Sequence, residues 1–254
     1  MQLEEYIRKT LGNKNILLMT HIVLGYPSLD INREVIRQMA ENGVDLIEMQ
    51  IPFSEPMADG PVIVKANQEA IETGTKVRQC MDFAAEITST YDIPFLFMTY
   101  YNILYQYGVE QFLKDSKKIG IKGFIIPDLP PEEGEEFFKL SREYGIDSVM
   151  IYAPTSTEER MKYLAGYGGG FVYCVARKGV TGKQTDFDEE FNSYMSRCRT
   201  STNMPLAVGF GISSKKDVEA LVGKADIAVI GTKTIKVVEE EGVGAVGSFI
   251  AGLR

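Results

Sequence analysis

Two carboxylates lie close together in the sequence, in surroundings that suit acid–base chemistry. Glu48 lies in the apolar segment Leu46–Gln50, and Asp59 follows in a loop that prolines stiffen. If the segment is a strand, alternation places Glu48 on the face opposite to Ile47 and Met49. A carboxylate that points into a core is desolvated, so its pKa rises and it can exchange protons near neutral pH. The pair is a candidate catalytic centre; the alternative for Glu48 is a structural pair with a buried Lys or Arg.

Glycine-rich segments later in the chain suit the binding of a phosphate. Gly209 and Gly211 lie in the segment 208–213, and Gly231 lies in the segment 230–234. Glycines let backbone N–H groups approach an anion, and the dipole of a following helix adds to the attraction. Tight turns without a ligand are the alternative. A third segment, 177–183, has the glycines and charges of a lid, although its charges can equally be solvated.

Short apolar runs alternate with amphipathic segments along the whole chain. The runs are apolar on both faces and rich in Val, Ile and Phe, which is typical of strands in a parallel sheet that helices cover. The expected strands span residues 16–23, 45–50, 95–100, 123–126, 148–152, 171–175, 206–208 and 227–230.

The segments between these runs carry helix start and stop signals. Pro131 is expected to open a helix that ends at Gly145. A serine, Ser213 or Ser214, can cap another, and a threonine within 155–157 can cap a helix over 158–165. Further helices are expected over 3–10, 31–40, 62–72 and 77–88.

Strict alternation of strand and helix predicts an α/β fold, a (β/α)₈ TIM barrel formed by a single domain over residues 1–254. An additional helix precedes the first strand, and extra helices follow strands two and eight. A doubly wound open sheet is disfavoured because the first strand lacks a glycine-rich turn after it. Barrels place their chemistry at the carboxyl ends of the strands and often hold phosphate after strands seven and eight.

The composition excludes several classes of function. A net charge of −8 argues against nucleic acid as a partner. The three cysteines have no metal-site spacing, and a single histidine, His21, excludes a histidine-rich metal site. No stretch of about 20 apolar residues is present, and the N-terminus does not look like a signal peptide. A cytoplasmic protein without a bound metal is therefore expected.

Taken together, four motifs resemble the tryptophan synthase alpha chain family. They are Glu48 with the segment 51–61, the segment 127–130, the segment 179–182 and the segment 209–213. Their order and spacing match the family across nearly the whole chain. The first motif is highly specific, whereas each of the others would be weak alone.

The resemblance implies a lyase that cleaves indole-3-glycerol phosphate to indole and glyceraldehyde 3-phosphate. It implies that Glu48 is the general acid–base and that Asp59 binds the indole N–H. The positions that match pocket, lid and phosphate-binding residues are Tyr100, Tyr173, Thr181, Gly182, Phe210, Gly211, Gly231 and Thr232.

The resemblance also implies a partner, a beta chain that receives the indole in an alpha2-beta2 heterotetramer. The positions that match the partner-facing residues are Pro52, Glu55, Asn102, Asp128 and Pro130. The pyridoxal phosphate would belong to the beta chain, so this chain would carry no cofactor.

Four positions depart from the family pattern. Glu55 and Thr232 stand where the family usually has Asp and Ser, which are conservative changes. Gln50 replaces a usual glycine and His21 a usual aromatic residue, and both are expected near Glu48. One hypothesis is that the two side chains satisfy each other by a hydrogen bond. The other is an altered pocket, with a changed pKa of Glu48 or a changed substrate.

Two rival functions also fit parts of the sequence. Another phosphate-binding barrel isomerase would share the segment 209–213, but would not explain Glu48 and Asp59 joined by a proline-rich loop. A regulatory subunit that activates a beta chain, with weakened catalysis of its own, would explain the partner-facing loops together with the unusual Gln50 and His21. An indole-release assay separates all three.

Overall fold

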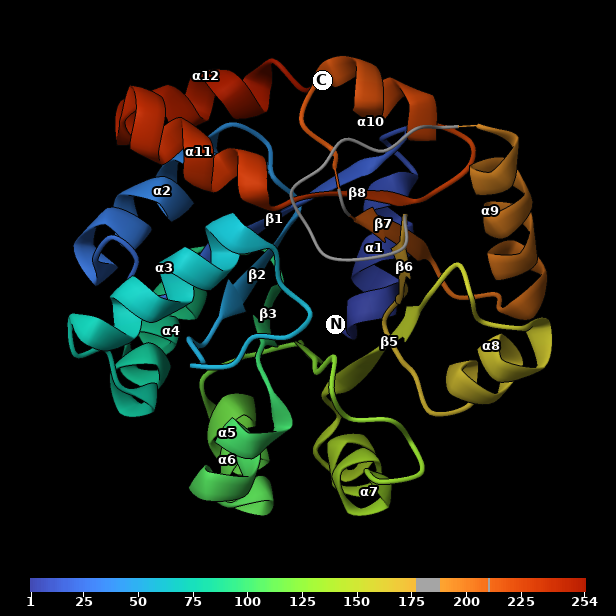
Figure 1. The fold of residues 1–254 in the computed structure, drawn as a ribbon, viewed down its shortest axis with the longest axis horizontal. Coiled ribbons are helices and arrows are strands. Elements are labelled where there is room, and N and C mark those ends of the chain that lie inside the picture. Colours follow the sequence, from blue (N-terminus) through green and yellow to red (C-terminus); the bar gives the residue numbers. More distant parts are fainter. Residues whose placement is uncertain (177–187, 210) are drawn as a thin grey trace.

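Eight parallel strands close into a barrel in chain order (Figure 1). The computed structural model describes residues 1–176, 188–209 and 211–254. The strands are β1 (Leu17–Val23), β2 (Leu46–Gln50), β3 (Phe95–Met98), β4 (Gly123–Ile125), β5 (Asp147–Tyr152), β6 (Val172–Val175), β7 (Leu206–Gly209) and β8 (Ile227–Ile230). The predicted barrel is confirmed, and the ends of each strand lie within two residues of their expected positions. Tyr100, expected at the end of the third strand, lies two residues after β3.

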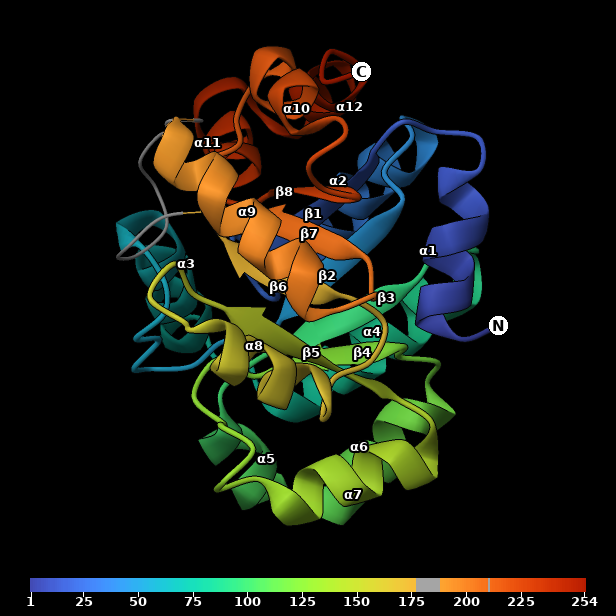
Figure 2. The same ribbon diagram turned by 90° about the vertical axis from the view of Figure 1, so that its right-hand side faces the viewer.

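Helices surround this barrel on all sides (Figures 1 and 2). They are α1 (Leu3–Leu11), α2 (Leu29–Glu41), α3 (Pro61–Glu72), α4 (Val77–Thr90), α5 (Tyr101–Tyr107), α6 (Val109–Lys118), α7 (Glu135–Tyr144), α8 (Glu158–Ala165), α9 (Glu189–Ser201), α10 (Lys215–Leu221), α11 (Thr232–Glu241), the 3₁₀ turn η1 (Val243–Ala245) and α12 (Val246–Ala251). The extra helices after strands two and eight are confirmed, and a second helix after β3 is an addition that the sequence reading did not include.

Most of the predicted helix ends are confirmed. The hydroxyl of Ser214 accepts the N–H of Asp217 at the start of α10, and Thr157 caps α8 in the same way. Gly145 ends α7 in a left-handed conformation. The start of α7 was wrong: Pro131 lies in a turn, and the helix begins only at Glu135. The first turn of a helix accepts proline, but a proline alone does not mark the start of a helix. A β-turn accepts the same backbone angle φ.

The core has two apolar layers, one on each face of the strands. Leu46 belongs to the layer inside the barrel, together with Leu17 and Met19. Ile47 and Met49 belong to the layer between strands and helices. This alternation along β2 is the one that the sequence predicts, and it turns Glu48 into the barrel.

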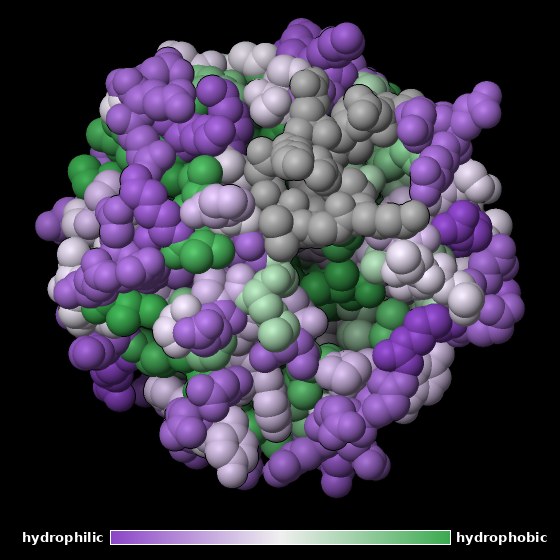
Figure 3. All heavy atoms as spheres, viewed as in Figure 1, coloured by the Kyte–Doolittle hydropathy of each residue, from purple (hydrophilic) through white to green (hydrophobic). Residues whose placement is uncertain are grey.

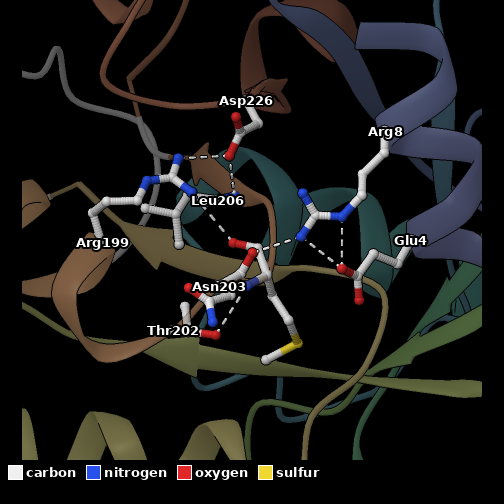
Figure 4. A network of polar contacts seen from close by, with 8 residues as sticks. Glu4, Arg8, Arg199, Thr202, Asn203, Leu206 and Asp226 are labelled. Carbon is white, nitrogen blue, oxygen red and sulfur yellow. Dashed lines mark hydrogen bonds and ion pairs between the residues drawn. The ribbon is translucent and has the colours of Figure 1, made fainter. Parts of the chain in front are cut away.

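Helix α1 closes the amino-terminal end of the barrel, where it is seen from the side in Figure 2. Leu3 and Ile7 of α1 are buried in the inner layer. Figure 4 shows how this end is joined by polar contacts: Arg8 donates to the carbonyl of Asn203 at 2.6 Å, and Arg199 donates to Asp226 at 2.6 Å. With this end sealed, a ligand must approach from the carboxyl ends of the strands.

Among the described residues, no helix is both long enough and apolar enough to span a membrane.

Candidate active site

Glu48 is buried at the carboxyl-terminal half of β2, inside the barrel. Only 5% of the residue is exposed, and Leu46, two residues earlier on the same face, lies in the inner apolar layer. The prediction that Glu48 points inward is confirmed. Its contacts show that the alternative of a structural pair with a buried Lys or Arg does not apply, because its partner is a histidine.

His21 and Glu48 form a hydrogen bond across two neighbouring strands. They are direct partners in the β1–β2 pairing, and Nδ1 of His21 lies 2.6 Å from Oε1 of Glu48. An ionised carboxylate can only accept, so the Nδ1–H of the imidazole donates. Within the described part of the chain, Nε2 of His21 and Oε2 of Glu48 have no hydrogen-bond partner. Each group therefore keeps one polar atom for a ligand.

The loop between β2 and α3 holds Asp59 in place. Pro61 is the first residue of α3, as its fixed backbone angle favours. Asn67, buried on α3, accepts the N–H of Phe53 at 2.9 Å and so ties the start of the loop to the helix. The N–H of Asp59 donates to the carbonyl of Pro56 at 3.0 Å. The expectation of a rigid platform for this carboxylate agrees with these contacts.

Two donors hold the Asp59 carboxylate. Nε2 of Gln50 donates to Oδ2 at 2.7 Å, and the Tyr100 hydroxyl donates to the same oxygen at 3.0 Å. The ring of Phe53 stacks on Tyr100 with centroids 5.1 Å apart. Both donors use Oδ2, so the donors found among the described residues leave Oδ1 to accept an N–H from a ligand. Each of the two unusual residues binds a carboxylate, His21 that of Glu48 and Gln50 that of Asp59. A side-chain hydrogen bond between His21 and Gln50 also contributes to the raised pKa of His21.

The charges of the site shift two pKa values. Burial lowers the pKa of His21, but the hydrogen bond and charge of Glu48, with the charge of Asp59, outweigh it and raise the pKa above its ordinary value. Burial raises the pKa of Asp59, and the charge of Glu48 adds to that rise. The charge of His21 and the hydrogen bonds from Gln50 and Tyr100 offset it only in part. The charges of His21 and Asp59 therefore shift each other's pKa in opposite directions.

Tyr173 on β6 lies in the same electrostatic field. Burial raises the pKa of its phenol well above the ordinary value, and the charges of Glu48 and Asp59 raise it further. A Cβ on Gly209 would lie 2.1 Å from the Tyr173 hydroxyl, so this glycine makes room for the ring. The phosphate-binding role that the sequence predicts for Gly209 stays a prediction, and the structure adds this packing role.

The phosphate-binding positions are only partly described. Gly211 adopts a φ of 84°, in the left-handed region that glycine favours. Gly231 precedes α11, whose amino-terminal N–H groups have no side-chain cap, and Thr232 is its first residue. The predicted positions Thr181, Gly182 and Phe210, and the lid segment 177–183, lie outside the described residues.

The face seen in Figure 1 is hollowed near its centre, and hydrophobic side chains line the hollow (Figure 3). Among the described residues, no group of three or more His, Cys, Asp or Glu side chains could hold a metal ion.

The partner-facing positions differ in exposure. Glu55, Asn102 and Pro130 are exposed, whereas Pro52 is buried and Asp128 is half-buried. The Asp128 carboxylate accepts the N–H of Tyr101 at 2.9 Å, at the start of α5. Two large apolar side chains stand next to the exposed positions, with exposed fractions of 76% for Met57 and 67% for Tyr105.

Sequence reasoning missed two residues that build the site. Phe53 supports the Tyr100 ring, and Asn67 anchors the loop. Asn67 had a visible signal, because it lies on the buried face of α3 with Ile63, Ala66 and Ala70. A polar residue on an apolar helix face needs a hydrogen-bond partner.

Comparisons with known proteins agree with this geometry. The family model of the tryptophan synthase alpha chain matches residues 8–247. The tryptophan synthase alpha chain of Desulfotalea psychrophila is 63% identical over 254 residues, which cover 100% of both chains. That of Syntrophotalea carbinolica is 57% identical over 252 residues, covering 99% of this chain and 100% of the relative.

Solved structures give the same result. A tryptophan synthase structure from Mycobacterium tuberculosis superimposes with a TM-score of 0.91 at 28% identity, covering 99% of this chain and 96% of that chain. A mutant tryptophan synthase alpha-subunit from Pyrococcus furiosus gives a TM-score of 0.86 at 30% identity, covering 93% and 97%. Since the family model and close relatives span almost the full length, this chain belongs to the tryptophan synthase alpha chain family.

Proposed function

We propose that Glu48 is the general acid–base and that Asp59 accepts the indole N–H in the reaction of this family. That reaction is the lyase cleavage of indole-3-glycerol phosphate to indole and glyceraldehyde 3-phosphate. The observation that carries the proposal concerns contacts among the residues that the structure describes: Oε2 of the buried Glu48 has no hydrogen-bond partner there, and both donors to Asp59 bind its Oδ2.

The reaction requires that the substrate gain one proton at the indole ring and lose one proton from its side-chain hydroxyl. A proton goes from Glu48 to carbon C3 of the indole, and the ring nitrogen becomes positively charged. The side-chain hydroxyl next to C3 then gives its proton to the Glu48 carboxylate. The bond between C3 and the carbinol carbon breaks, its electrons restore the indole ring, and an aldehyde is released. Asp59 stabilises the cationic intermediate because its carboxylate faces the N–H where positive charge develops.

The remaining site positions fit a phosphorylated aromatic substrate. Tyr100 and Tyr173 line the barrel interior beside the carboxylates. Gly211, Gly231 and Thr232 stand after β7 and β8, where backbone N–H groups and the start of α11 suit a phosphate. Gly182 and Phe210 are proposed to complete this part of the site, and Thr181 is proposed to help position the Asp59 loop.

The test is the release of indole from indole-3-glycerol phosphate by the wild-type chain and by Glu48→Gln, each with and without a beta chain. Wild-type release should fall by about 10²–10⁴-fold in the variant, the usual contribution of a general acid–base. Circular dichroism and the unfolding midpoint show whether the variant is folded. A folded Glu48→Gln chain with wild-type indole release would contradict the role of Glu48.

Alpha chains of this family work with a beta chain, and the pyridoxal phosphate belongs to that beta chain. We propose an alpha2-beta2 heterotetramer in the cytoplasm, with the beta chain on the surface around Glu55, Asn102 and Pro130. The exposed Met57 and Tyr105 support this surface, because large exposed apolar side chains commonly mark a binding face. Light scattering of the purified complex measures the stoichiometry.

A further inference from the structure

Gln50 offers the Asp59 carboxylate a donor from a rigid part of the barrel. Its side chain is fully buried, and it is the last residue of β2. Its backbone carbonyl accepts the N–H of Leu24 at 2.9 Å, and it is paired with Val23 of β1 and Met98 of β3. A residue on a strand that is paired on both sides holds its position better than one in a loop, where Asp59 lies.

The amide of Gln50 has one possible orientation toward Asp59. An ionised carboxylate has no hydrogen to donate, so the contact of 2.7 Å requires the Nε2 end of the amide to face Oδ2. The contact between Gln50 and His21 raises the pKa of the imidazole, which only the amide oxygen can do, because it accepts from a ring N–H. The two ends of the amide therefore face different partners.

Both donors to Asp59 bind the same carboxylate oxygen. Nε2 of Gln50 lies 2.7 Å from Oδ2, and the Tyr100 hydroxyl lies 3.0 Å from it. A carboxylate oxygen has two lone pairs, so two donors use its capacity. One donor comes from β2 and the other from the segment after β3, so together they fix the rotation of the carboxylate group. With one donor the group could pivot about a single contact.

We propose that Gln50 is a positioning residue that acts through Asp59: it holds Oδ2 so that Oδ1 meets the ring N–H of the substrate. It thereby makes the site select a ring that carries an N–H. This inference rests on the proposed role of Asp59. The glycine that is usual at position 50 in the family has no side-chain group to donate to the carboxylate.

The hydrogen bond from Gln50 also favours the form of Asp59 that binds an N–H. Burial raises the pKa of this carboxyl, and the charge of Glu48 adds to the rise. The charge of His21 lowers the pKa, as do the hydrogen bonds from Gln50 and Tyr100. A carboxylate accepts an N–H on Oδ1, whereas a carboxyl protonated there presents a hydrogen of its own. Loss of the Gln50 amide therefore weakens N–H binding through both the position and the charge of Asp59.

The test compares two ligands that differ only in the ring donor. Indole carries an N–H, and benzofuran has the same bicyclic shape with an oxygen in that place. The selectivity is the dissociation constant of benzofuran divided by that of indole, measured by NMR titration of the full-length chain. Gln50→Met keeps the length of the side chain and removes its N–H. The selectivity should fall about tenfold in this variant, since a hydrogen bond to a charged group commonly contributes that factor or more.

A second variant and a control separate the hydrogen bond from packing. Gln50→Gly introduces the residue that is usual in the family, and it should lower the selectivity as Gln50→Met does. Gln68→Met is the matched control: this exposed glutamine of α3 also donates to a carboxylate, that of Glu72, at 2.9 Å. Its replacement should leave the selectivity unchanged. Circular dichroism and the unfolding midpoint show which variants are folded.

A double-mutant cycle shows whether Gln50 acts through Asp59. Asp59→Ala removes the acceptor of the ring N–H and should abolish the selectivity by itself. In that background Gln50→Met should cause no further loss. An equal loss from Gln50→Met with and without the Asp59 carboxylate would contradict the proposal, because Gln50 would then act on the ligand directly.

Kinetics distinguish positioning from the filling of space. Asp59 is proposed to stabilise the positive charge that develops on the ring during the reaction. Its displacement in Gln50→Met should therefore lower kcat for indole release about tenfold, with a smaller change in KM. A side chain that only fills the pocket would change KM and leave kcat in place. An unchanged kcat in folded Gln50→Met and Gln50→Gly chains would overturn the proposal.

The outcomes also separate this inference from the proposed function. If Asp59→Ala loses the selectivity for indole but both substitutions of Gln50 keep it, the role of Asp59 stands and only this inference fails. If Asp59→Ala keeps the wild-type selectivity, the proposed role of Asp59 fails and this inference fails with it.

Discussion

The hydroxyl of Tyr100 lies 3.0 Å from Oδ2 of Asp59 and accepts the N–H of Ala58, the residue before it, at 3.1 Å. One phenol thus fixes both the carboxylate and the backbone that carries it. Tyr100 lies between β3 and α5, so it links the loop after β2 to the next strand of the barrel, and this contact sets where Asp59 meets a ligand.

Tyr100→Phe removes both hydrogen bonds and should lower indole release. The hydrogen bond from Tyr100 lowers the pKa of Asp59, so its loss raises that pKa further. Asp59 accepts the indole N–H best as a carboxylate, and the acidic limb of the kcat/KM–pH profile should therefore move to higher pH. The cost in unfolding free energy should be about 1–3 kcal/mol, because the Ala58 N–H loses its partner.

Tyr101→Phe is the matched control for that change. The Tyr101 hydroxyl makes no hydrogen bond within the described part of the chain, so its loss should leave the acidic limb in place. An acidic limb that shifts equally in both variants, or in neither, would show that the contact between Tyr100 and Asp59 does not tune the carboxylate.

Asp59→Asn should inactivate the site and stabilise the protein. The pKa of Asp59 is raised in the folded state, mainly by burial, so ionisation is less favourable there than in the unfolded chain. The protein is therefore most stable, as far as Asp59 is concerned, below the unfolded-state pKa of this residue. Its stability falls as pH rises through the folded-state pKa, and at pH 7 the ionised carboxylate destabilises the fold to its full extent. Asparagine removes the charge and can still accept from Gln50 and Tyr100.

The gain at pH 7 should be about 0.5–2 kcal/mol, the common range for a stabilising substitution, and should vanish as pH falls below about 4. Chemical denaturation at several pH values measures it. Glu55→Gln, an exposed change in the same loop, should stay within about 0.5 kcal/mol at every pH. A less stable Asp59→Asn chain at pH 7 would mean that the carboxylate holds the loop together.

The barrel could be predicted from the sequence because its signals are local. Runs that are apolar on both faces mark the strands, and alternation along β2 is enough to turn Glu48 inward. The helix boundary at Pro131 failed because the same residue type suits a helix start and a turn. Only packing decides between these two.

The partners of the site residues could not be predicted, because they depend on distances across the barrel. Sequence showed that His21 and Gln50 were unusual and near Glu48, but it could not say which carboxylate each would bind. The pairing of His21 with Glu48 follows from the register between β1 and β2. Register is a property of two paired strands, so the sequence of one strand alone does not predict it.

Gly209→Ala should displace Tyr173 and disturb the pocket. The new Cβ would lie 2.1 Å from the Tyr173 hydroxyl and 2.6 Å from ring carbons, so the ring must move. The expected loss of stability is about 1–3 kcal/mol, as for other overpacked sites, with a raised KM for indole-3-glycerol phosphate.

A double-mutant cycle with Tyr173→Ala tests this reason. Gly209→Ala should cost less stability in the Tyr173→Ala background, because the ring it collides with is absent. Gly244→Ala is the control glycine: nothing lies within 4 Å of its added Cβ. Equal costs of Gly209→Ala in both backgrounds would contradict the collision.

Asp45→Ala should destabilise the protein and leave its chemistry intact. Asp45 precedes β2, at the end of the barrel opposite to Gln50, and its side chain is 3% exposed. Oδ2 accepts the N–H of Leu18 at 2.9 Å and a guanidinium N–H of Arg254 at 2.6 Å, while Oδ1 pairs with Lys14. Removing one partner of a buried ion pair usually costs about 3–5 kcal/mol.

For a chain of this size, that loss corresponds to a fall of about 10 °C in the unfolding midpoint, which calorimetry measures. Asp82→Ala removes a carboxylate from an exposed pair with Arg78 and should change stability by less than about 1 kcal/mol. At temperatures where both variants are folded, kcat and KM for indole release should equal those of the wild type. A changed KM in Asp45→Ala would show that the amino-terminal end of β2 transmits strain to Glu48, because Asp45 directly precedes the short strand that carries Glu48.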